Sequence, residues 1–111
     1  MNTSIIKFDY NGTIIHFSKG DNVMVNATEM AKPFGKLVGD WLRLKTTTEF
    51  AEALSADMHI PISALIQVVK GGNNEQGTWM HEDVALEFAR WLAQLLPFGA
   101  INASKSYFNM A

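Results

Sequence analysis

The stretch that most constrains the fold is residues 68–92, which begins with two strand-like runs around a polar turn. Residues 68–70 are typical of the end of a short strand, and residues 78–80 are typical of a return strand. Residues 71–77 between them are rich in glycine and asparagine, which tolerate positive φ. The pattern therefore predicts a β-hairpin over residues 66–80.

A strongly apolar helix is predicted directly after this hairpin. Its apolar side chains recur at the spacing of one helical face: Val84, Phe88, Trp91, Leu92 and Leu95. The run His81-Glu82-Asp83 has the residue types of an acid–base cluster. We interpret it as the start of the helix, because the helix dipole favours carboxylates in the first turn.

The N-terminal third contains a second hairpin signal. Asn11-Gly12 lies between two apolar runs in residues 5–17, and Asn-Gly in that setting favours a two-residue hairpin turn. Residues 23–25 are typical of a short third strand. Asn26 is expected to cap a helix with Glu29 three residues later, and Pro33 with Gly35 is expected to end it.

The middle of the chain predicts two further helices. One covers residues 37–44, with Leu37, Trp41 and Leu44 on its buried face. The other starts at a second capping pattern, residues 46–49, and is broken by His59-Ile60-Pro61. One helical turn and a strand are expected over residues 62–69, and a short terminal helix over residues 103–110. The predicted core consists of Trp41, Phe50, Leu54, Trp79, Phe88 and Trp91.

Composition bounds the class of protein. With 111 residues, 48% hydrophobic and 18% charged, the chain is expected to form one folded domain over residues 1–111. It has no cysteine, no apolar run long enough for a membrane span and no signal-peptide pattern, so we expect a cytoplasmic protein. No nucleophile motif and no metal-ligand spacing of histidines occurs. We therefore predict no catalysis, no metal and no cofactor.

Charge is sorted mildly along the chain. The net charge is −2, yet residues 32–45 contain Lys32, Lys36, Arg43 and Lys45 against Asp40 alone. Cations supply phosphate contacts, helix N-termini add oriented N–H groups, and asparagine amides can contact base edges. The candidate DNA-binding residues on helix ends and on the hairpin tip are Lys36, Arg43, Lys45, Thr46, Thr47, Lys70, Asn73 and Asn74.

Three segments together resemble the KilA-N domain: MVNATEMAKPFGK, GDWLRLKTTTEFAEAL and VVKGGNNEQGTWMHEDVALEFARWL. The resemblance covers residues 23–92, and after Leu92 the sequence departs from the family pattern. KilA-N domains occur in proteins of large DNA viruses and bacteriophages and are similar to the APSES DNA-binding domain. The resemblance implies an α+β fold, with a small antiparallel β-sheet and a hairpin wing packed on several helices.

The resemblance also implies a function. We expect a non-catalytic module that docks on double-stranded DNA through basic helix ends and the wing, as in phage or viral transcription regulation. The alternative is an antirepressor-like adaptor that binds a regulator protein, which the low net charge and the amide-rich tip favour. A nuclease is a distant third hypothesis, because the sequence has no visible cluster of metal-binding carboxylates.

Overall fold

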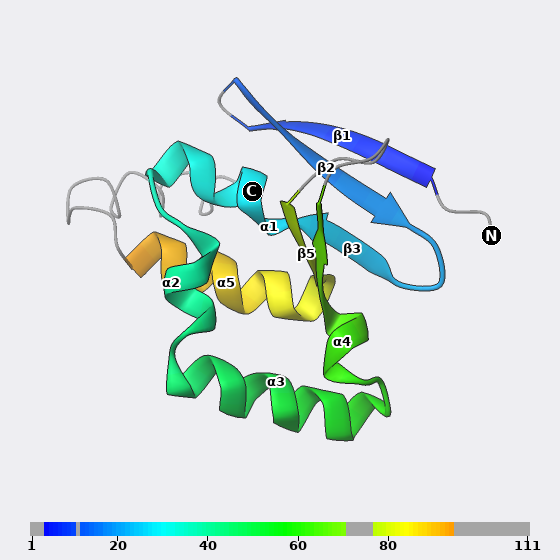
Figure 1. Ribbon diagram of the computed structural model, residues 1–111. Coiled ribbons are helices and arrows are strands. Elements are labelled where there is room, and N and C mark those ends of the chain that lie inside the picture. Colours follow the sequence, from blue (N-terminus) through cyan, green and yellow to red (C-terminus); the bar gives the residue numbers. More distant parts are fainter. Residues whose placement is uncertain (1–3, 11, 71–76, 95–111) are drawn as a thin grey trace, which may run out of the picture.

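A five-stranded antiparallel sheet with helices packed along one side forms the fold (Figure 1). The computed structural model describes residues 4–10, 12–70 and 77–94. The strand order is β1-β2-β3-β5-β4, and the α+β class expected from the sequence is confirmed. The strands are β1 (Ser4–Tyr10), β2 (Thr13–Lys19), β3 (Val23–Asn26), β4 (Ile66–Val69) and β5 (Gly77–His81).

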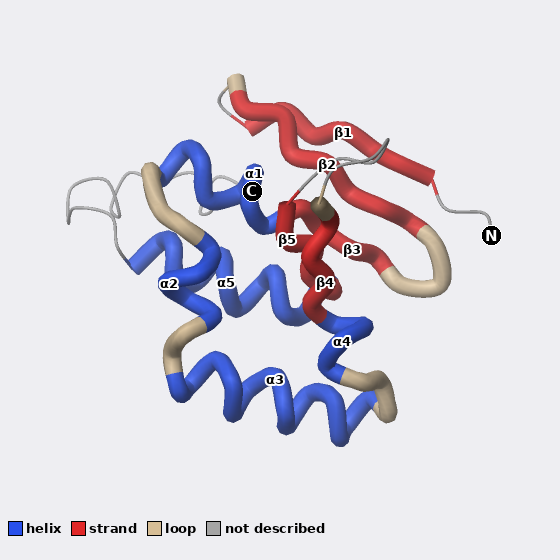
Figure 2. The backbone as a smooth tube through the Cα atoms, in the orientation of Figure 1, coloured by secondary structure: helices blue, strands red, loops and turns tan. Residues whose placement is uncertain are grey.

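The helices fill the long connection between β3 and β4 and the segment after β5 (Figure 2). They are α1 (Ala27–Ala31), the 3-10 turn η1 (Lys32–Phe34), α2 (Val38–Leu42), α3 (Lys45–Met58), α4 (Ile62–Leu65) and α5 (Glu82–Gln94). In Figure 1, α5 runs beneath the sheet and α3 lies farther from it. The sheet and the helices thus enclose one core.

Both predicted hairpins are present. Strands β1 and β2 pair from Ser4↔Lys19 to Tyr10↔Thr13, and the turn is closed by Gly12, whose N–H donates to Asp9 Oδ1 at 2.9 Å. Gly12 has φ +86, a conformation that glycine adopts without steric cost. Strands β4 and β5 pair from Ile66↔Met80 to Val69↔Gly77. The predicted strand at residues 23–25 is confirmed as β3.

Helix α5 supplies the centre of the core, as its apolar spacing predicts. Phe88 is fully buried, and its ring lies 5.2 Å from that of Trp41 and 5.9 Å from that of Trp91. The other predicted core residues also lie inward: Trp79 is buried, and Phe50, Leu54 and Trp91 are partly buried against the core. Leu95 and the helix expected over residues 103–110 lie outside the described residues.

Helix α2 differs from the prediction in its buried face. Leu37 has an extended backbone, precedes the helix and is 69% exposed. The buried positions are Val38 and Trp41 instead, with Leu42 partly buried. Leu44 is likewise extended and lies outside α2. Of the three residues predicted on the buried face, Trp41 is buried, whereas Leu37 and Leu44 lie outside this five-residue helix.

The start of α3 also corrects the prediction. The expected capping pattern begins at Thr46, whereas the helix already begins at Lys45, after Leu44. The Leu44 carbonyl accepts the N–H groups of Thr47 and Thr48 at 3.1 and 3.2 Å, so the first helical turn closes before a threonine cap forms. At the other end His59 adopts φ +58 and ends the helix, as expected.

The central position of Phe88 gives a test of the core. Phe88→Ala is expected to lower the free energy of unfolding by about 3–5 kcal/mol, because it removes buried area and leaves a cavity between two tryptophans. The control is Leu86→Ala on the exposed side of the same helix, which should change stability by no more than about 0.5 kcal/mol. Urea denaturation followed by tryptophan fluorescence measures both, and equal losses would contradict the assigned register of α5.

Candidate nucleic-acid interface

The β4–β5 hairpin, which we call the wing, is an extension of the sheet. Strand β5 pairs with β4 on one side and with β3 on the other, through Met24↔His81, Val25↔Met80 and Asn26↔Trp79. Met80 is fully buried, so the base of the wing is anchored in the core. The sheet and the core therefore hold the base of the wing in place.

A contact between residues far apart in the sequence holds the wing on α1. The N–H of Thr78 donates to Thr28 Oγ1 at 2.9 Å, across fifty positions of the chain. Gly77 beside it has φ +129, and a Cβ there would lie 2.8 Å from Thr28 Oγ1 and 3.0 Å from Asn26 Oδ1. Only glycine fits this position without displacing backbone or side chains. The segments 25–28 and 77–81 are therefore one structural unit.

Asn26 links strand β3 to helix α1. Its side-chain oxygen accepts the N–H of Glu29 at 3.1 Å, which is the N-cap predicted from the sequence. Asn26 is fully buried and pairs with Trp79 of the wing. One residue thus ends a strand, starts a helix and lies beside the base of the wing.

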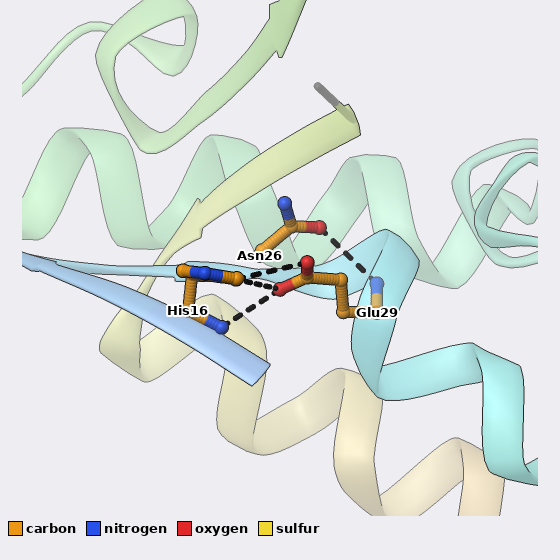
Figure 3. A network of polar contacts seen from close by, with 3 residues as sticks. All are labelled: His16, Asn26 and Glu29. Carbon is orange, nitrogen blue, oxygen red and sulfur yellow. Dashed lines mark hydrogen bonds and ion pairs between the residues drawn. The ribbon is translucent and has the colours of Figure 1, made fainter. Parts of the chain in front are cut away.

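Glu29 joins the same unit to the N-terminal hairpin (Figure 3). Its Oε1 accepts the backbone N–H of His16 at 2.7 Å, and His16 Nδ1 lies 3.0 Å from both carboxylate oxygens. A carboxylate accepts only, so His16 Nδ1 carries a hydrogen here. Both side chains are largely buried, at 11% and 14% exposed. The sequence predicts Glu29 only as part of a capping pattern, and the structure gives its carboxylate this tertiary role.

His81 ends strand β5 and serves the start of α5. Its Nδ1 accepts the N–H of Asp83 at 3.1 Å, which requires a lone pair on that nitrogen. The Asp83 carboxylate lies 3.9 Å from the same nitrogen, too far for a hydrogen bond. The interpretation of His81-Glu82-Asp83 as a helix start is confirmed, because α5 begins at Glu82.

Two of the predicted cations flank the short connection between α2 and α3. Arg43 is exposed and pairs with Asp40, and Lys45 is exposed with its Nζ 4.0 Å from Glu49. Exposed pairs of this kind contribute about 0–1 kcal/mol, so either cation can exchange its partner for another anion. Thr46 is exposed next to them. Thr47 is a correction: it is only 4% exposed, so its side chain faces the interior and is removed from the candidate surface.

The other predicted DNA-binding residues lie on other parts of the fold. Lys36 follows η1, and Lys70 follows β4; both are exposed, and within the described ranges neither has a carboxylate partner. Lys32, the first residue of η1, is also exposed. In Figure 1 the α2–α3 connection and the end of β4 lie well apart, so the predicted residues do not form one cluster. Asn73 and Asn74 lie outside the described residues.

Neither a metal centre nor a membrane span can be assigned to the described part of the chain. No group of three or more histidine, aspartate or glutamate side chains there is arranged to hold a metal ion. No described helix is both long and apolar enough to cross a membrane.

The fold and the wing define a small α+β module in which a hairpin of the sheet is fixed on a helix. The profile of the KilA-N domain matches residues 6–109, and the chain belongs to this family. The chain is also 30% identical over 73 residues to a protein of Acanthamoeba polyphaga mimivirus that is named for its KilA-N domain. The match covers 64% of this chain and 20% of that protein. No solved structure matches the chain significantly.

The Thr28–Thr78 contact gives a second test. Thr28→Val keeps the shape of the side chain but removes the acceptor, and is expected to lower the free energy of unfolding by about 1–3 kcal/mol because the Thr78 N–H loses its partner. Thr46→Val, the same change at an exposed threonine, should stay within about 0.5 kcal/mol. Chemical denaturation measures both variants. A neutral Thr28→Val would mean that the wing is held by its strand pairing alone.

The Glu29 carboxylate gives a third test of the structure. Glu29→Ala is expected to cost about 1–3 kcal/mol of stability, because the buried His16 N–H and ring lose their acceptor. Glu29→Gln should cost less, since its amide oxygen can still accept one of these bonds. Glu52→Ala on the exposed side of α3 is the control. If glutamine and alanine were equally destabilising, the charge of Glu29 rather than its role as an acceptor would be responsible.

Proposed function

We propose that this chain is a non-catalytic module that binds double-stranded DNA, with the wing and neighbouring cations contacting the phosphate backbone. The observation that carries the proposal is membership of the KilA-N family, which implies a DNA-binding role, in a chain whose wing is fixed at its base. Strand pairing and the contact with Thr28 hold the base of the wing in one position relative to the sheet. Such a support lowers the entropy lost when a ligand is bound.

The distribution of charged side chains restricts which parts of the molecule would approach DNA. Lys36 and Lys70 are exposed cations with no carboxylate partner in the part of the chain that the structure describes, so they are available for phosphates. The exposed side of α3, in contrast, becomes acidic after its first turn, with Glu49, Glu52 and Asp57. A helix with that surface would be repelled from a groove along its length. We therefore propose that α3 approaches DNA only through its first turn, near Lys45 and Thr46.

The primary test is binding to mixed-sequence duplex DNA at low salt, followed by a salt titration. Binding is expected to weaken steeply with salt, and Lys36→Ala and Lys70→Ala should each reduce the slope of log K against log salt by about 1. Lys19→Ala, at the far end of strand β2, carries the same change of charge as a control. Absence of binding at low salt would overturn the proposal.

The acidic partners of Arg43 and Lys45 allow a test by increased affinity. Asp40→Asn and Glu49→Gln each remove an anion that competes with phosphate, so both should strengthen DNA binding if the α2–α3 connection contacts DNA. Asp57→Asn is the matched control, because it lies twelve residues along α3 from Lys45, roughly 18 Å away and beyond the screening length of about 10 Å at 0.1 M salt. Equal effects of all three variants would indicate only a change in net charge.

The acidic surface of α3 also favours the second hypothesis, an adaptor that binds a basic surface of a regulator protein. The net charge of −2 agrees with this. The two functions separate experimentally, because Glu52→Lys should improve binding to DNA and weaken binding to a basic protein partner.

The candidate DNA residues Asn73 and Asn74 stay part of the proposal, with relaxed base specificity as the expected effect of their alanine variants.

A further inference from the structure

Strand β1 is an edge strand with an unusual amount of exposed apolar surface. It pairs with β2 on one side only and lies at the end of the strand order, so its other edge is open among the described strands. All seven residues are exposed, including four large apolar ones: Ile5 54%, Ile6 44%, Phe8 54% and Tyr10 39%. Open edges of this kind are sites of pairing with another chain unless they are covered.

Successive side chains of β1 alternate between the two faces of the sheet, so three of its four large apolar residues share one face, and the fourth, Ile5, shares the other face with the charged residues. Ile6, Phe8 and Tyr10 share one face, and the Phe8 ring packs edge-on against Phe17 of β2 at 6.4 Å. Lys7 and Asp9 lie on the opposite face. Asp9 gives one oxygen to the turn at Gly12, which leaves its second oxygen for another partner. Lys7 has no ion pair in the part of the chain that the structure describes.

The sequence of β1 is complementary to that of a second, antiparallel copy of the same strand. If two β1 strands pair antiparallel about a two-fold axis at Phe8, Lys7 lies opposite the partner's Asp9 and Asp9 opposite the partner's Lys7. Ile6 then lies opposite the partner's Tyr10, and the two Phe8 side chains meet on the axis. An axis at Lys7 would place two lysines opposite each other, and an axis at Asp9 two aspartates. Among these three registers, only the one centred on Phe8 pairs opposite charges.

We propose that β1 is a dimerisation strand, through which two copies of this chain join their sheets in the register centred on Phe8. The pairing satisfies the open backbone groups of both edges and brings Ile6, Phe8 and Tyr10 of each copy into one apolar patch. Two equivalent Lys7–Asp9 pairs on the other face select the register. This inference does not rest on DNA binding, because none of the candidate DNA-binding residues lies on β1.

The test is the oligomeric state of the full chain, measured by sedimentation velocity over a wide range of concentration. The wild type is expected to dimerise. Lys7→Asp places aspartate opposite aspartate at two positions and should raise the dimer dissociation constant at least about tenfold. Lys19→Asp makes the same change of charge on β2, away from the open edge, and should leave the dimer unchanged. Circular dichroism verifies the folding of each variant.

A mixing experiment tests the register itself. Asp9→Lys should also weaken self-association, because lysine then faces lysine. When the Lys7→Asp and Asp9→Lys chains are mixed, aspartate faces lysine at both positions, so a heterodimer should form with affinity near that of the wild type. If Asp9→Lys fails to fold, the comparison of Lys7→Asp with Lys19→Asp still tests whether β1 forms the dimer contact.

Two outcomes overturn the proposal. A wild-type chain that stays monomeric at every concentration would show that β1 does not pair with a second copy. A wild-type dimer that Lys7→Asp and Lys19→Asp affect equally would place the dimer contact elsewhere on the molecule.

Discussion

The buried residue Asn26 makes the interactions on which the remaining architecture depends. It ends strand β3, caps helix α1 by accepting the Glu29 N–H, and pairs with Trp79 at the base of the wing. A buried amide must satisfy its hydrogen-bonding groups, since each unsatisfied one costs about 1–3 kcal/mol. Helix α1 therefore has to begin at this point, and its first turn then brings Thr28 to the wing and Glu29 to His16. Three separate parts of the chain are held through one helical turn.

This arrangement gives a physical account of two of the segments that resemble the KilA-N domain. Residues 25–28 and 77–81 contact each other in the structure through Thr28, Gly77 and Thr78. Their residues are fixed by packing and hydrogen bonding at the base of the wing, so these two segments support the wing.

Local signals in the sequence were sufficient for much of the fold. Asn11-Gly12 predicts the first hairpin, the spacing of Val84, Phe88 and Leu92 predicts the buried face of α5, and both follow from interactions within a few residues. In α2 the predicted burial of Trp41 is confirmed, but Leu37 and Leu44 lie outside the helix, because a five-residue helix has too few positions to define its register. The His16–Glu29 and Thr28–Thr78 contacts could not be predicted, because they join residues 13 and 50 positions apart. The candidate cations were chosen from the distribution of charge along the sequence. Their separation in space could not be predicted, because it depends on how the helices pack on the sheet.

The firmly held base of the wing has a consequence for how such domains diversify. Val69 and Gly77 are paired in the ladder, so the ends of the connecting segment, residues 71–76, are already brought together by the sheet. The entropy of closing such a loop rises by only about 0.6 kcal/mol for each doubling of its length. Insertions and new sequences in this segment would therefore cost little stability. Evolution or protein engineering could therefore replace this segment while the scaffold that supports it stays the same.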